Sequence, residues 1–191
     1  MKATLSLVIL LLFFAANSFA QTFKAGAALR KIMPEKLIPI SGGMGTPVLP
    51  TGMKGDLFVR ALVLEKGDTR VAIVNIDNLG WPAYLADRSR KLIKGVKPEN
   101  VLIGVTHTHS APDAYAFPDE KGNHGADLAY LEWCVKQVAE AVNEAVSKLE
   151  PASLKTAVGE AKGKIAYNYY APELYDRRMG VIQAVATTGA N

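Results

Sequence analysis

A strand-helix-strand pattern limits the possible folds of this chain more than any other feature of its sequence. Arg70 to Asp77 is rich in β-branched residues, Pro82 opens a helical segment that ends at Gly95, and Val101 to Val105 is a continuous apolar run. Such a unit brings two parallel strands together through a right-handed crossover. Because the second run contains no polar side chain, it predicts a strand buried on both faces.

Further strands extend this unit into an α/β fold with mixed β-sheet layers flanked by helices. Thr22 to Leu29 predicts an opening strand. Phe58 to Glu65 precedes the hairpin signal Lys66-Gly67-Asp68-Thr69, so it should pair antiparallel with Arg70 to Asp77. Two late strands are predicted, one over 154–161 and one over 180–187.

Helical periodicity identifies two segments that should cover the sheet. The longer runs from Asp127 to Glu150, and Pro151 is expected to end it. Its apolar stripe, predicted as core, consists of Leu128, Leu131, Val135, Val138, Val142, Val146 and Leu149. The shorter helix, after Pro82, should place Leu85, Leu92 and Ile93 on its inner face.

The first twenty residues have the pattern of a secretory signal peptide. Lys2 precedes an apolar run from Leu5 to Ala16, and Ser18-Phe19-Ala20 offers small residues where a signal peptidase cuts. We expect cleavage after Ala20, a secreted or periplasmic location, and one domain over 21–191. An uncleaved membrane anchor is the alternative, although the run is shorter than the roughly 20 residues that cross a bilayer.

Charge and cysteine content exclude some classes of function. Residues 1–20 contain one Lys and no acidic residue, so the formal charge falls from +4 to +3 on cleavage. No cluster of Lys and Arg is interleaved with aromatic residues, which argues against nucleic-acid binding. The single cysteine, Cys134, lies among apolar helix positions and is predicted to be a buried thiol.

Two histidines follow the apolar strand and form the strongest candidate site. His107 and His109 are two residues apart, so on an extended backbone they face the same side about 6.5–7 Å apart. Asn75 and Asp77 end the neighbouring parallel strand at the same edge of the sheet. Imidazole nitrogen is a favoured zinc ligand, and Asp77 could orient one ring. The alternative is a pair of hydrogen-bonded histidines that orders the turn before Pro112.

The segment VLIGVTHTHSAP, over 101–112, resembles the signature of neutral/alkaline ceramidases, which carry a Thr-His-Thr-His-Ser-Gly-Pro turn after an apolar strand. FVRALVLEKGDTRVAIVNIDNLGW, over 58–81, is similar to the paired strands of that family. Tyr167-Asn168 and Met179 to Ile182 fall where the family has an Asn-bearing loop and a following strand. The resemblance covers essentially the whole chain after residue 20, in order.

The resemblance implies that His107 is a direct zinc ligand and that His109 handles a proton or stabilises the transition state. Asn75, Asp77 and Asn168 would lie beside the site or the substrate. Family enzymes cleave the amide of ceramide by attack of a zinc-activated water, so the implied cofactor is Zn2+ and the implied substrate is a linear N-acyl lipid. Such a substrate would allow contact with a membrane surface; an oligomeric state is not implied.

This sequence departs from the family pattern at several positions. Ala111 replaces the usual Gly, Asp113 replaces another small residue, and Tyr169 stands where ceramidases commonly place Arg. In the family a further His and later Glu and Tyr ligands follow the region that ends here at Asn191, so the resemblance implies a C-terminally truncated member. A non-catalytic exported binding domain, or an inactive fragment that retains the fold, is therefore the alternative function.

Three other polar residues are weaker site candidates. His124 lies in a Gly-containing loop and is expected to be solvated. Ser110 lacks the Gly-x-Ser-x-Gly context of a nucleophile, so a turn-capping role is predicted. Arg60 is expected to pair with a carboxylate within the sheet.

Overall fold

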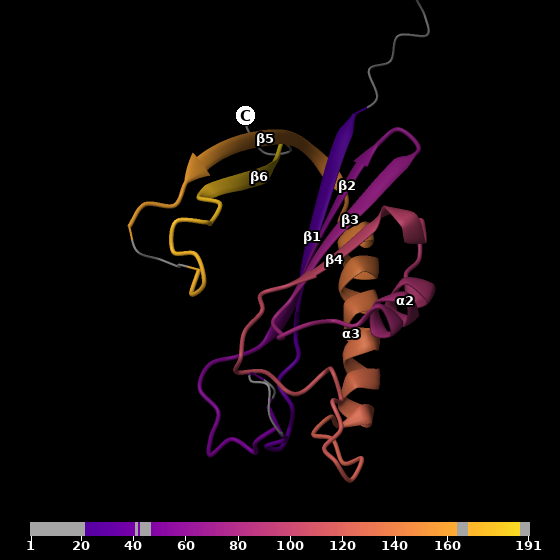
Figure 1. Cartoon of the computed structure of the whole chain (residues 1–191). Helices are drawn as coiled ribbons and strands as arrows, with labels where there is room; N and C mark the ends of the chain where they lie inside the picture. Colours follow the sequence, from indigo (N-terminus) through magenta and orange to yellow (C-terminus); the bar gives the residue numbers. More distant parts are fainter. Residues whose placement is uncertain (1–21, 41, 43–46, 164–167, 188–191) are drawn as a thin grey trace, which may run out of the picture.

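The computed structural model describes residues 22–40, 42, 47–163 and 168–187. The predicted signal peptide, most of the glycine-rich segment 41–46 and Tyr167 lie outside these residues. The described elements are β1 (Phe23–Lys31), β2 (Phe58–Lys66), β3 (Thr69–Ile76), α2 (Ala83–Leu92), the 3-10 turn η1 (Pro98–Asn100), β4 (Val101–Val105), α3 (Leu128–Ser147), β5 (Glu150–Glu160) and β6 (Arg178–Ala186). Figure 1 shows both helices on one side of the sheet.

The strands form a mixed sheet in the order β4-β3-β2-β1-β5-β6. β2 and β3 pair antiparallel around a turn in which Gly67 has a φ of 58°, as the hairpin signal predicted. β3 and β4 pair parallel, with Ile76 opposite Val105, so the predicted crossover through α2 is confirmed. The predicted α/β fold class is confirmed by this arrangement.

The hydrophobic core lies between α3 and one face of β1 to β4. Valines at inward positions of the strands, among them Val59, Val63 and Val74, are at most 1% exposed. Gly26 of β1 allows the helix to approach closely, because a Cβ there would lie 2.1 Å from the Ala145 carbonyl oxygen. Burying side chains of this size stabilises the fold by roughly 1.5–3 kcal/mol each, which explains why helix and sheet form one unit.

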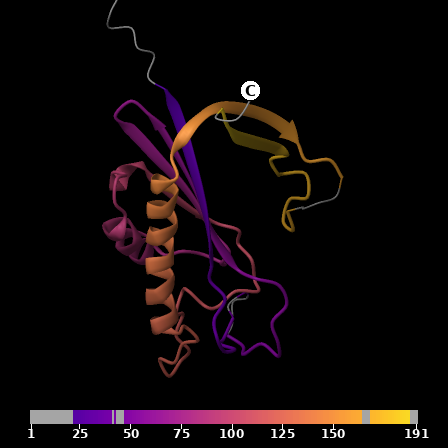
Figure 2. The ribbon, with the colours of Figure 1, turned by 180° about the vertical axis from the view of Figure 1, so that it is seen from behind.

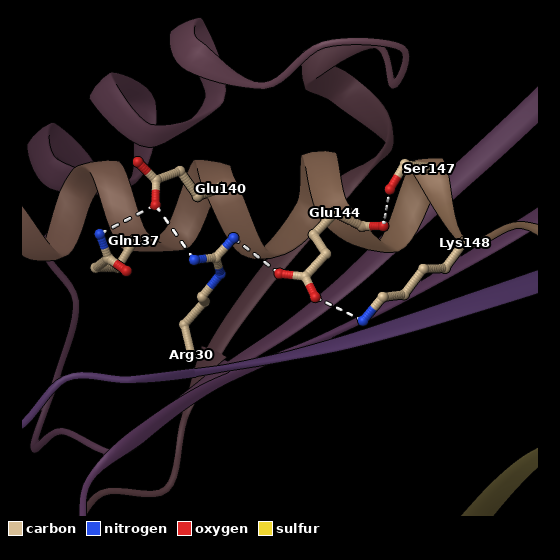
Figure 3. Close-up of polar contacts among 6 residues, drawn as sticks. All are labelled: Arg30, Gln137, Glu140, Glu144, Ser147 and Lys148. Atoms are coloured by element: carbon tan, nitrogen blue, oxygen red, sulfur yellow. Dashed lines mark hydrogen bonds and ion pairs between the residues drawn. The ribbon is translucent and has the colours of Figure 1, made fainter.

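Ion pairs at the surface add to the contact between α3 and β1 (Figure 3). The Arg30 guanidinium lies 2.8 Å from a Glu144 oxygen and 3.7 Å from a Glu140 oxygen. Lys148 also pairs with Glu144, at 2.5 Å. The Lys148 ammonium and the Arg30 guanidinium hold the pKa of Glu144 below its usual value. Exposed pairs of this kind contribute little free energy, so packing rather than charge holds the helix.

The predicted helix boundaries and inner faces need correction. α3 begins after Asp127, whose side chain accepts a hydrogen bond from the Tyr130 amide, but it ends at Ser147 because Glu150 and Pro151 already belong to β5. Leu128, predicted as core, is 64% exposed, whereas Leu131 in the same turn is 4% exposed. In α2, Leu85 is buried as predicted, and so is Ile93, the residue after the helix. Leu92, also predicted on the inner face, is 44% exposed.

The prediction that Val101 to Val105 is buried on both faces is wrong. Val101 is 4% exposed on the helical side, but Leu102 is 63% exposed on the other. β4 is the last strand at its end of the sheet, and no described element covers the face opposite the helices. An apolar run therefore predicted the strand correctly but not its surroundings.

β5 and β6 form a two-stranded arm that begins earlier than predicted for β5. β5 pairs with β1 only where Lys24 and Ala25 face Pro151 and Glu150, and then pairs along its length with β6. Figures 1 and 2 show the arm curving to the side away from the helices. Within the described residues, no helix combines the length and apolar character needed to cross a membrane.

Candidate functional site

The two predicted site histidines lie side by side after β4. Backbone pairing continues past the strand, because the Thr106 amide donates to the Ile76 carbonyl at 3.0 Å. His107 and His109 are both exposed, and their ring centres are 5.4 Å apart with the planes inclined at 71°. The structure thus brings both imidazoles to the carboxyl end of two parallel strands, the edge where ligand sites of such sheets lie.

His107 has an unusual backbone and a defined ring partner. Its φ is 58°, a left-handed conformation that few residues other than glycine adopt and that is common at functional sites. Its Nδ1 lies 2.7 Å from the Leu79 carbonyl oxygen. Because a carbonyl can only accept, Nδ1 carries the proton, and in the neutral ring Nε2 has the free lone pair. No described residue forms a hydrogen bond to Nε2.

Asp77 and Asn75 are placed at the same sheet edge but contact other groups. The Asp77 carboxylate accepts from the Arg60 guanidinium at 2.8 and 2.9 Å and from the Phe58 amide at 2.9 Å. The expected structural role of Arg60 is confirmed by this pair. Asn75 is half-buried beside Arg60 in the sheet register. The ring of His107 is thus oriented by Leu79 in place of Asp77.

The remaining predicted residues lie in turns. Asn168 accepts from the Tyr170 and Ala171 amides at 3.0 and 3.3 Å and donates to the Leu174 carbonyl, so its side chain orders its own loop. The Ser110 amide donates to the Thr108 hydroxyl, so the capping hydroxyl of this turn belongs to Thr108. His124 is exposed in its loop. None of these contacts links Asn168 or His124 to the histidine pair.

The donor set fits part of a zinc site. His107 presents an unprotonated nitrogen, and two imidazoles bound to one tetrahedral zinc ion have ring centres roughly 5 Å apart, close to the separation found here. Within the described part of the chain, however, no three His, Cys, Asp or Glu side chains are arranged to hold one ion. The described residues therefore supply at most two of the three or four protein donors that zinc requires.

An apolar cavity of about 430 Å³ adjoins the histidine segment. Thr108 and Ser110 contribute to its wall, together with the apolar Met33, Leu37 and Ile38. Neither histidine lines it; Thr108 and Ser110, which alternate with the histidines along the chain, do. On the histidine side, Gly42 approaches closely, since a Cβ there would lie 2.7 Å from the His109 Cβ.

Cys134 is excluded as a nucleophile. It is 1% exposed in α3, which confirms the predicted buried thiol. Burial raises the pKa of this thiol to about 12, so almost no thiolate forms at neutral pH. The neighbouring Tyr130 donates its hydroxyl to the Ile32 carbonyl at 2.7 Å, and burial also raises the pKa of that hydroxyl.

Sequence reasoning missed the groups that surround the ring of His107. Leu79 acts through a backbone carbonyl, which no side-chain pattern can reveal. Gly80 and Tyr115 meet only in the folded chain, where a Cβ on Gly80 would lie 2.0 Å from the Tyr115 hydroxyl oxygen. A glycine four residues after the end of β3 was an available signal of such a close approach.

Solved ceramidase structures share this architecture. No protein-family model and no curated protein matches the sequence. A neutral ceramidase from Pseudomonas aeruginosa superposes with a TM-score of 0.71 at 20% identity, and a ceramidase complexed with C2 with a TM-score of 0.66 at 21% identity. Each comparison covers 88% of this chain but 30% of the solved chain, so this chain spans less than a third of their length. The chain has a neutral ceramidase-like fold.

Proposed function

We propose that this chain carries the His-x-His part of the active site of a zinc-dependent hydrolase that cleaves linear amides, with ceramide-like N-acyl lipids as the substrate class. One observation carries the proposal. His107 is held in a left-handed backbone with Nδ1 on the Leu79 carbonyl, leaving Nε2 free beside His109 at the sheet edge. The structural likeness to solved ceramidases also supports a hydrolase function.

His107 would hold the metal through Nε2, because its Nδ1 is already engaged. A zinc ion held there would supply an activated water and polarise the amide carbonyl. His109 lies close enough to take up a proton and pass it to the departing amine nitrogen. The products are a carboxylic acid and an amine, and no covalent intermediate with the protein is needed.

The apolar cavity supports a lipid substrate. The apolar part of its wall, with Met33, Leu37 and Ile38, suits a hydrocarbon chain, while Lys54 and Asp56 add charge. Thr108 and Ser110, which alternate with the histidines, also line it. The remaining zinc donors would have to come from outside the described residues, since these provide two at most. The signal-peptide pattern of residues 1–20 supports a location outside the cytoplasm for this activity.

Hydrolysis of a ceramide by the purified protein, with zinc present, tests the proposal. Protein that carries a full set of zinc donors should release fatty acid, and His107→Ala should abolish the release. His124→Ala should leave it unchanged, because that histidine is exposed in its own loop. Zinc binding without hydrolysis would favour the non-catalytic binding domain. Equal hydrolysis by wild type and His107→Ala would contradict the proposed role.

A further inference from the structure

The peptide group between Leu79 and Gly80 determines how His107 is oriented. Its carbonyl oxygen accepts the proton of His107 Nδ1 at 2.7 Å. Its amide, on Gly80, donates to the Asn78 side-chain oxygen at 3.3 Å. Because a peptide group is planar, any shift at Gly80 turns the carbonyl that holds the ring.

Asn78 fixes one side of this peptide plane. It is 1% exposed, and its side-chain nitrogen donates to the Pro112 carbonyl at 3.3 Å. Pro112 follows the two histidines in sequence, so Asn78 links the end of β3 to the segment that carries them. Asn78 therefore holds the Gly80 amide nitrogen, but it does not contact the Gly80 Cα.

Tyr115 fixes the other side. A Cβ built on Gly80 would lie 2.0 Å from the Tyr115 hydroxyl oxygen, 2.3 Å from Cζ and 2.7 Å from Cε2, so the edge of the ring rests against the Gly80 Cα. Distances below 3.0 Å cannot be relieved without moving either the ring or the peptide. Glycine is therefore the residue that this contact permits.

Tyr115 is itself anchored. The buried Asp113 accepts from the Tyr115 amide at 2.9 Å and from the Ala116 amide at 3.3 Å, and Ala116 has a φ of 54°. The Phe117 ring stacks on the Tyr115 ring with centres 5.0 Å apart and planes inclined by 6°. The Tyr115 backbone is thus anchored, and its ring, 37% exposed, lies between the Phe117 ring and Gly80.

We propose that Tyr115 is a positioning residue: by resting on Gly80 it fixes the Leu79 carbonyl, and so keeps the His107 proton on Nδ1 and Nε2 free. This role rests on the proposed function, because the choice of tautomer matters where Nε2 is to hold a metal ion. Tyr115 does not contact the reacting atoms; it acts through the backbone of residues 79 and 80.

Nitrogen-15 NMR of the metal-free chain, at a pH above about 7.5 where imidazole is neutral, reads the tautomer directly. Wild-type His107 should show a protonated Nδ1 and an unprotonated Nε2. Gly80→Ala should give a mixture of both tautomers. Gly104→Ala is the matched control, because the nearest atom to its added Cβ lies 4.0 Å away, and it should keep the wild-type pattern.

Substitutions of Tyr115 separate positioning from general stability. Tyr115→Phe keeps the ring carbons that touch Gly80 and should keep the Nδ1 proton, whereas Tyr115→Leu removes the support and should give the mixture. Tyr115→Leu adds no atoms, so it provides the test if Gly80→Ala fails to fold. A folded Tyr115→Leu or Gly80→Ala variant with the wild-type tautomer would overturn the proposal. A wild-type chain with the fixed tautomer but no zinc binding would contradict the proposed function alone.

Discussion

The two faces of the sheet are built from similar apolar residues but have different surroundings. On the face against α3, Val63 and Ile76 are fully buried. On the opposite face, Leu29 and Leu102 are 55% and 63% exposed. A hollow of about 580 Å³ lies on this open face, with Leu62 and Ile73 in its wall. The comparison teaches that apolar character placed these residues in strands, while burial followed the position of α3.

The covered face also supports the candidate site. β3 ends at Ile76, whose carbonyl accepts the Thr106 amide at the start of the histidine segment. The buried end of β3 is followed, after the half-buried Asp77, by Asn78, Leu79 and Gly80, which are buried. The segment that carries the exposed histidines is therefore bonded to buried backbone, at Ile76 and Leu79, and such support preorganises a site.

The largest expected effect compares two isoleucines of β3 that face opposite sides. Ile76→Ala should lower the free energy of unfolding by about 2–5 kcal/mol, because it leaves a cavity under α3. Ile73→Ala, on the half-buried open face, should cost less than about 1.5 kcal/mol because little packing is lost there. Urea denaturation of both variants measures the difference; equal losses would show that the open face is also covered.

A smaller effect is expected from the buried hydrogen bond that Tyr130 makes in the first turn of α3. Tyr130→Phe should lower the free energy of unfolding by about 1–3 kcal/mol, since the buried Ile32 carbonyl loses its donor. Tyr84→Phe is the control, because Tyr84 is 68% exposed in α2 and should cost under about 0.5 kcal/mol. Thermal unfolding compares them, and similar losses would argue against the buried bond.

Glu65 is a charged exception on the covered face, at 8% exposure. Hydrogen bonds from Arg70 and Lys24 hold the pKa of this carboxyl below its usual value. Its contribution to stability is therefore present above the unfolded pKa, near about 4.3, and lost as the pH falls through the lower folded pKa. Glu65→Gln should be less stable than wild type at pH 7 and should lose less stability on acidification. Denaturation at several pH values measures this. If the free energies of unfolding of both proteins decrease equally as the pH falls, the prediction is wrong.

The smallest expected effect is on the open face. Leu102→Lys should change the free energy of unfolding by under about 0.5 kcal/mol, because the side chain is already 63% exposed. The same change should lower the fluorescence of an apolar dye bound to the chain, since it interrupts the exposed apolar surface. A loss of stability as large as that of Ile76→Ala would mean that Leu102 is covered in solution.

Periodicity predicted the elements well, because strands and helices are encoded by local spacing. The β2–β3 hairpin, the parallel crossover and the inner face of α3 followed from residues such as Gly67, Leu131 and Val138. The exposure of Leu102 and Leu128 could not be predicted, since it depends on which elements end or lie beside them. Apolar sequence reports the tendency to be buried and not the presence of a covering layer.

For the site, the sequence indicated the two histidines but not what holds them. Spacing along an extended strand predicted that His107 and His109 would share one side, although the left-handed φ of His107 means that the segment is not simply extended. Its place at the same sheet edge suggested that Asp77 could orient a histidine ring, yet its carboxylate accepts a hydrogen bond from Arg60. Contacts through the Leu79 carbonyl and the Tyr115 ring depend on tertiary structure and leave no pattern in the side chains.

Zinc titration of the purified, metal-free chain tests most directly whether the histidine pair is a metal site. Because the described residues supply at most two donors, the wild-type chain should bind zinc weakly through its two histidines. His107→Ala should weaken that binding further, and His124→Ala should leave it unchanged. If His107→Ala takes up zinc with the same stoichiometry and affinity as the wild-type chain, His107 does not hold the metal and the proposed function is wrong.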